Sequence, residues 1–95
     1  MHLRGSHATL SLQPAASDPI CLLRIPHWDF HWQGSYAFTD PKTVNPGDSF
    51  SIECHWDNSA QNQPVVGGQQ LAPADLNWGE GSTDEMCLGF VYATQ

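Results

Sequence analysis

Basic residues are scarce in this chain: Lys and Arg together number 3, against 10 Asp and Glu, for a formal net charge of -7. A chain with so little positive charge lacks the electrostatics to grip phosphate backbones or anionic lipid surfaces. Long apolar runs are missing too, since none approaches the roughly 20 residues that a bilayer-spanning helix needs. We therefore expect neither a nucleic acid partner nor a membrane partner.

Sustained helical periodicity is also lacking, because Pro and Gly interrupt the 95 residues at short intervals, and no internal repeat is visible. This pattern predicts an all-β chain folded as one small domain with a thin core, an antiparallel β-sandwich of jelly-roll type. The polar stretch 57–85 lacks alternation and is expected to be an ordered surface loop. The expected strands are 3–12, 21–25, 30–38, 49–56 and 87–92, with turns at 13–19, 40–41 and 45–48.

Alternation sorts the side chains of two of these segments, because successive side chains of a strand leave on opposite faces. Segment 49–56 places an apolar set on one face, namely Phe50, Ile52, Cys54 and Trp56, and leaves Ser51, Glu53 and His55 to water or a groove. Segment 26–33 places His27, Asp29 and His31 together, opposite Trp28, Phe30 and Trp32. On an extended strand these three potential ligands span roughly 13 Å, so two of them but not all three reach one ion. The alternative is that Asp29 pairs with a neighbouring backbone N–H or histidine while the histidines are solvated.

Three cysteines leave one without a partner in any single pairing. The context favours a Cys54–Cys87 disulfide, because each lies in a strand-like apolar segment, and leaves Cys21 free. Such a bond stabilises a fold by roughly 3 to 4 kcal/mol and indicates an oxidising compartment. The alternative is three reduced, buried thiols in a cytosolic protein.

The segment Asp84-Glu85-Met86-Cys87 places a thioether between acidic residues and a cysteine. A methionine there is an unusual filler for a core gap, whereas thioether sulfur suits Cu(I) when imidazole supplies the other ligands. The sequence therefore indicates a copper site that includes Met86, with histidine elsewhere on the same face.

Five short motifs follow one another along the chain: His2-Leu3-x-Gly5, Trp28-Asp29-Phe30-x-Trp32-Gln33, Pro46-Gly47-Asp48, Glu53-Cys54, and Trp78-Gly79 with Glu85-Met86-Cys87. Together they resemble the C-terminal copper domain of the copper type II, ascorbate-dependent monooxygenases, which include dopamine β-hydroxylase and peptidylglycine α-hydroxylating monooxygenase. The resemblance covers nearly the whole chain, and it assigns residues 1–95 to this one domain. It is strongest to the bacterial branch, because residues 28–33 read Trp-Asp-Phe-His-Trp-Gln.

The resemblance implies that this domain holds the copper that activates dioxygen, through the two histidines of a His-x-His motif and the methionine of Glu-Met-Cys. It assigns His2 as the second histidine and Met86 as the thioether ligand, and it implies the same Cys54–Cys87 disulfide. The first histidine would stand just before Met1. We therefore expect an N-terminally truncated fragment that begins inside the motif. The candidates for the missing third ligand are water, the chain's own amino terminus and His31, and of these we expect the amino terminus.

Further partners are implied by the same resemblance: an N-terminal copper domain, ascorbate as reductant, dioxygen and a small-molecule substrate, in a secreted or periplasmic protein. Without the N-terminal domain the chain is not expected to turn over efficiently.

Two other functions stay open at this point. A stand-alone copper-binding or electron-transfer module predicts tight copper binding by His2 and Met86 with a replacement third ligand. A non-metal β-sandwich used for binding through its tryptophans predicts exposed aromatics and no metal. Tryptophans of a small sandwich are more often core than platform, and we expect core positions for these.

Overall fold

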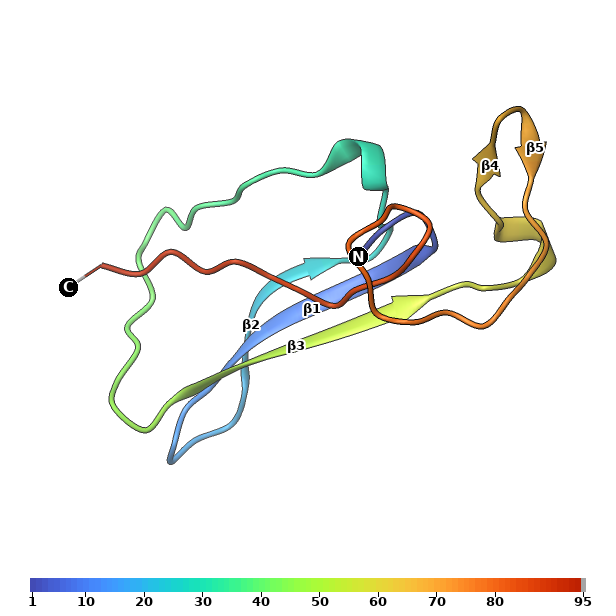
Figure 1. Cartoon of the computed structure of the whole chain (residues 1–95). Coiled ribbons are helices and arrows are strands. Elements are labelled where there is room, and N and C mark those ends of the chain that lie inside the picture. The colour runs from blue at the N-terminus through green and yellow to red at the C-terminus, as the bar shows by residue number, and fades with distance from the viewer. Residues whose placement is uncertain (95) are drawn as a thin grey trace.

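The computed structural model describes residues 1–94 of the chain. Over these residues the regular structure consists of β-strands and two short 3-10 turns, with no α-helix (Figure 1). The all-β prediction is therefore confirmed. No helix in the described residues is long and apolar enough to cross a membrane.

The main sheet has three antiparallel strands in the order β2-β1-β3. Strand β1 (Gly5–Gln13) lies in the centre and pairs with β2 (Ile20–Ile25) on one side and β3 (Ser49–Trp56) on the other. A register shift between Gly5 and His7 interrupts the β1–β3 ladder near the start of β1. Three of the five predicted strands are thus confirmed, with no boundary differing by more than two residues.

The alternation predicted for segment 49–56 is confirmed by the register of the sheet. Leu12 lies opposite Phe50 and Leu10 opposite Ile52, so the apolar side chains of β1 and β3 share one face. Leu12 is the most buried of them, at 2 % exposed, whereas Phe50 and Ile52 remain partly exposed. The core is as thin as the length of the chain predicts.

The strands predicted at 30–38 and 87–92 are wrong. Residues Phe30–Trp32 form the 3-10 turn η1 instead, because the Asp29 carboxylate accepts a hydrogen bond from the His31 N–H and caps the turn. Residues 33–48 and 86–94 have no ladder partner in the described part of the chain. Residues 33–48 form a wide loop from η1 to the start of β3, whereas 86–94 pass beside the sheet and then leave it (Figure 1).

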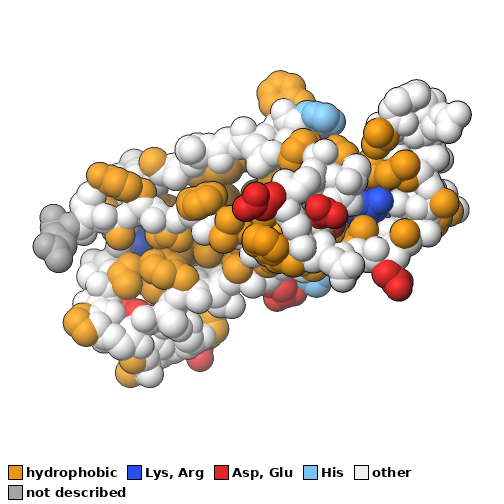
Figure 2. All heavy atoms as spheres, viewed as in Figure 1, with side chains coloured by type: hydrophobic (Ala, Val, Ile, Leu, Met, Phe, Trp, Pro, Cys, Tyr) orange, Lys and Arg blue, Asp and Glu red, His pale blue; other side chains and the backbone are white. Residues whose placement is uncertain are grey.

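These two segments border the apolar face of the sheet and, with it, line one long groove. Hydrophobic side chains gather over this part of the molecule (Figure 2). Several are strongly exposed, among them Trp32, Tyr36, Phe90 and Tyr92. A sandwich requires a second sheet against this face, and residues 1–94 contain none there, so the sandwich and its jelly-roll topology stay predictions.

The polar stretch 57–85 is more structured than the expected surface loop. It contains the 3-10 turn η2 (Ala60–Asn62) and a small hairpin of β4 (Val65–Val66) and β5 (Gln69–Gln70). Gly67 and Gly68 make the turn of this hairpin with φ of 61° and 81°. A two-residue hairpin turn with two positive φ angles needs residues such as glycine, so Val-Val-Gly-Gly-Gln-Gln was the available signal.

Candidate metal centre

The Glu85 carboxylate is the centre of a buried polar cluster that joins the start of the chain to β3. It is 6 % exposed and accepts three hydrogen bonds. Its Oε2 accepts from the His2 N–H at 2.7 Å and the Trp56 indole N–H at 2.9 Å, and its Oε1 accepts from the Arg4 N–H at 2.8 Å. A buried carboxylate needs such donors, and here they fix the backbone on both sides of Leu3.

The backbone around Glu85 is held in place by its own loop. Glu85 pairs with Trp78 in a parallel bridge, where the Gly79 N–H donates to the Glu85 carbonyl at 3.0 Å and the Glu85 N–H donates to the Asn77 carbonyl at 3.3 Å. A Cβ at Gly79 would collide with the Asp84 carboxylate, so glycine is required for this close approach. The loop therefore returns to itself immediately before Met86.

His2 is fixed at its ring as well as at its backbone. The ring Nδ1 lies 3.0 Å from the Asp84 carbonyl oxygen. Because a carbonyl only accepts, Nδ1 carries the proton of the neutral ring and Nε2 keeps its lone pair. The Trp28 indole N–H donates to the His2 carbonyl at 3.0 Å, and Phe30 packs edge-on against the imidazole. His2 is thus buried, oriented and left with one free nitrogen, the arrangement usual for a histidine that ligates a metal.

Met86 lies between two anchors. Glu85 precedes it with the contacts just described, and Cys87 follows it with a disulfide to Cys54 in β3. The disulfide joins residues 33 apart in sequence and confirms the predicted pairing. The remaining cysteine, Cys21, is free and exposed as expected. The backbone that carries the thioether is consequently tied to both β3 and the segment that carries His2.

Arg4 extends the polar cluster to two further loops. Its side chain is 3 % exposed, and its Nε donates to the Gln63 Oε1 at 3.0 Å while Nη1 donates to the Thr83 carbonyl at 2.6 Å. Gln63 in turn donates to the carbonyls of Asn58 and Ser59. A buried guanidinium that is satisfied by neutral oxygens holds these loops against the strand that follows His2.

The amine of Met1 lies beside the same cluster. Burial lowers its pKa below the usual value, and the nearby Glu85 carboxylate opposes that effect. A lower pKa favours the neutral amine, the form with a lone pair for a metal. The role of this amine as a third copper ligand stays a prediction.

The other predicted ligands do not assemble. His27 and His31 are exposed, and Asp29 is engaged in capping η1, which confirms the alternative interpretation of that segment. Nowhere in residues 1–94 do three His, Cys, Asp or Glu side chains form a cluster able to hold an ion. The core positions expected for the tryptophans are wrong for Trp32, Trp78 and Trp56, which are 83 %, 68 % and 40 % exposed.

Sequence reasoning missed the roles of Glu85 and Arg4. Glu85 was noted within its motif, but no position in the sequence reveals that its carboxylate meets donors more than 80 residues earlier. A signal for Arg4 was available, because it is one of only 3 basic residues and stands two positions after His2. Trp56 and Glu85 also line a small apolar pocket with Leu76, Asn77 and Trp78, next to the cluster.

Comparison with known proteins identifies a family whose match includes the residues of this candidate centre. The family model of the copper type II ascorbate-dependent monooxygenase, C-terminal domain, matches residues 1–94 and so includes His2, Glu85, Met86 and the disulfide. No curated protein and no solved structure gives a significant match. The disulfide and the family together indicate an extracellular or lumenal compartment. The chain belongs to the copper type II ascorbate-dependent monooxygenases, over their C-terminal domain.

Proposed function

We propose that this chain is the catalytic-copper part of a monooxygenase that hydroxylates a small molecule with dioxygen and ascorbate, and that His2 and Met86 are copper ligands. The observation that carries the proposal is the burial of His2 together with the hydrogen bond that orients its imidazole ring. Its Nδ1–H is committed to the Asp84 carbonyl, so Nε2 is the free donor on a buried ring held beside the backbone that leads into Met86.

The donor set fits copper. Neutral imidazole and thioether are soft enough to hold Cu(I), and an exposed carboxylate cluster of the kind that hard cations need is absent from this part of the described chain. Copper held there would supply one-electron chemistry toward dioxygen. The protein's own contribution is to orient the ligands: Glu85 fixes the backbone of His2, and the disulfide fixes the segment of Met86.

The rest of the proposal concerns partners. An N-terminal copper domain would supply the second metal centre, and the exposed aromatic side chains along 32–44 and 88–94 offer an apolar surface of the kind that a neighbouring domain covers. We further propose that the whole protein is secreted or periplasmic, in keeping with its disulfide.

Copper binding tests the ligand assignment. We would measure Cu(I) affinity by competition with a chelator, and sulfur ligation by X-ray absorption, on the native chain and on Met86→Ile and His2→Gln. One tight Cu(I) with a sulfur scatterer is expected for the native chain. Met86→Ile should remove the sulfur scatterer, and both variants should weaken the affinity at least about tenfold.

The matched control is His27→Gln, which removes an exposed histidine and should leave Cu(I) affinity unchanged. Copper that is bound with equal affinity by Met86→Ile, without any sulfur scatterer in the native chain, would refute the assignment of Met86. A native chain that binds no Cu(I) at all would favour the non-metal binding domain, for which the exposed Trp32 and Trp78 are the supporting observation.

A further inference from the structure

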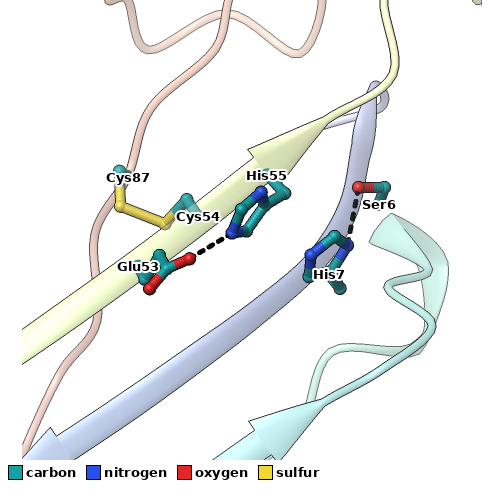
Figure 3. A network of polar contacts seen from close by, with 6 residues as sticks. All are labelled: Ser6, His7, Glu53, Cys54, His55 and Cys87. Atoms are coloured by element: carbon teal, nitrogen blue, oxygen red, sulfur yellow. Dashed lines mark hydrogen bonds and ion pairs between the residues drawn. A yellow bond between two sulfur atoms is a disulfide. The ribbon is translucent and has the colours of Figure 1, made fainter.

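A second pair of histidines lies on the main sheet, apart from the cluster around Glu85. His7 in β1 stands directly opposite His55 in β3. The two imidazole rings stack, with centroids 4.0 Å apart and planes inclined by 13°. Figure 3 shows the rings lying against each other across the two strands.

The sheet places these histidines on its outer face. Along β3, His55 alternates with Cys54, so it points away from the face that carries Ile52 and the disulfide, and Glu53 shares its face. The register shift between Gly5 and His7 resets the alternation of β1, and brings His7 onto the face of His55. The side chains of His55 and Glu53 are 44 % and 71 % exposed, so solutes reach them freely.

Each ring has one nitrogen engaged and one left over. His55 Nε2 lies 2.5 Å from the Glu53 Oε1, and because a carboxylate only accepts, Nε2 carries the proton of that pair. His55 Nδ1 is then the free donor atom. His7 Nδ1 lies 3.1 Å from the Ser6 hydroxyl, which leaves His7 Nε2 without a hydrogen bond. Glu53 and Ser6 flank the stacked pair on its two outer sides (Figure 3).

We propose that His7 and His55 bind a divalent transition-metal ion, Zn(II) or Cu(II), on the outer face of the sheet, with Glu53 as the carboxylate that orients His55. Cross-strand neighbours have Cβ atoms about 5 Å apart, which lets two imidazoles reach one ion. A carboxylate that accepts the other ring N–H is the usual support of a ligating histidine. Imidazole donors suit Zn(II) and Cu(II), and no thioether is present to favour Cu(I).

The ion requires a small rearrangement. Stacked rings aim their lone pairs in parallel, so both side chains must turn about their χ angles before two nitrogens meet one ion. No third His, Cys, Asp or Glu completes the site in residues 1–94, and water fills the other coordination positions. Both rings are accessible and carry one or no protein contact at each nitrogen, so the turn disturbs little of the sheet. The bound ion would tie β1 to β3 on the face opposite the disulfide.

The test is a Zn(II) titration of the full chain, followed by the ring protons of the five histidines in NMR spectra and by calorimetry. Zn(II) should shift the ring signals of His7 and His55 first, with a stoichiometry of one ion. His7→Gln and His55→Gln should each weaken that binding at least tenfold, and Glu53→Gln about 10- to 100-fold, as for other orienting carboxylates. Cu(II) should displace Zn(II), since it binds such ligands more tightly.

His27→Gln is the matched control, because it removes an exposed histidine elsewhere and should change nothing. Zn(II) affinity that is unchanged in His7→Gln, or that is lost in His2→Gln while His7→Gln is normal, would overturn the proposal. Circular dichroism checks that each variant folds. Should one unfold, the native chain decides alone, because ring signals of His7 and His55 that stay unmoved at saturating Zn(II) exclude the site.

Discussion

Glu85→Gln is the sharpest test of how the site is held, because it removes a charge with almost no change of shape. The amide oxygen can replace Oε2 and keep the bonds from His2 and Trp56, but the amide NH₂ then faces the Arg4 N–H, a donor against a donor. Two retained bonds lose their charged acceptor, at about 1 kcal/mol each, and one buried N–H is orphaned, at about 1 to 3 kcal/mol. We expect a loss of about 3 to 5 kcal/mol in the free energy of unfolding.

Urea denaturation followed by tryptophan fluorescence measures this loss, and Trp56 reports on the cluster directly. Glu80→Gln is the control, because Glu80 is exposed in the same loop and its loss removes the same charge. Its midpoint should move little. Equal midpoints for Glu85→Gln and Glu80→Gln would refute the view that the carboxylate anchors the start of the chain.

Three further predictions concern the frame around the site. Replacing both disulfide cysteines by alanine should lower the free energy of unfolding by about 3 to 4 kcal/mol, measured by urea denaturation, since the bond spans 33 residues. Gly5→Ala should cost about 1 to 3 kcal/mol, because its Cβ would lie 2.6 Å from the Trp28 ring, whereas Gly34→Ala, which meets nothing, should cost far less. The hydrogen bonds with Ser59 lower the pKa of Asp57 in the folded protein. Ionised Asp57 therefore stabilises the fold at pH values above its ordinary pKa, and this stabilisation is lost as the pH falls through the pKa of the folded state. In Ser59→Ala, NMR titration of the carboxyl group should show a pKa of Asp57 that rises toward normal.

The pattern of neighbouring residues correctly predicted the elements that depend on interactions between residues close in sequence. Alternation in 49–56 and the Asn-Pro-Gly-Asp turn before it gave β3 and its apolar face, since side chains two residues apart must share a face. Segment 30–38 failed because Asp29 offers its carboxylate to the His31 N–H, a competing local bond that periodicity does not register. Residues 87–92 failed for a different reason: a strand needs a neighbour, and a one-dimensional pattern does not say whether one is in reach.

The candidate site likewise has features that the sequence predicted and features that it did not. The disulfide pairing and the family followed from residue types in order along the chain, and both are confirmed. The burial of His2 and the tautomer of its ring could not be predicted from the sequence. Both depend on the Asp84 carbonyl and the Glu85 carboxylate, which only the tertiary fold brings next to His2. Sequence periodicity is least able to predict polar contacts between segments that are far apart in the sequence.

The bond between His2 and Glu85 spans 83 residues, and that separation has a consequence for how the protein is made. The entropy of loop closure must be met before so distant a contact forms, whereas the β1–β2 hairpin closes over a short connection. During synthesis the sheet can begin to pair while the Glu85 segment is still being translated. The two proposed ligands therefore come together as one of the last events of folding, and copper offered to the nascent chain would meet His2 without Met86.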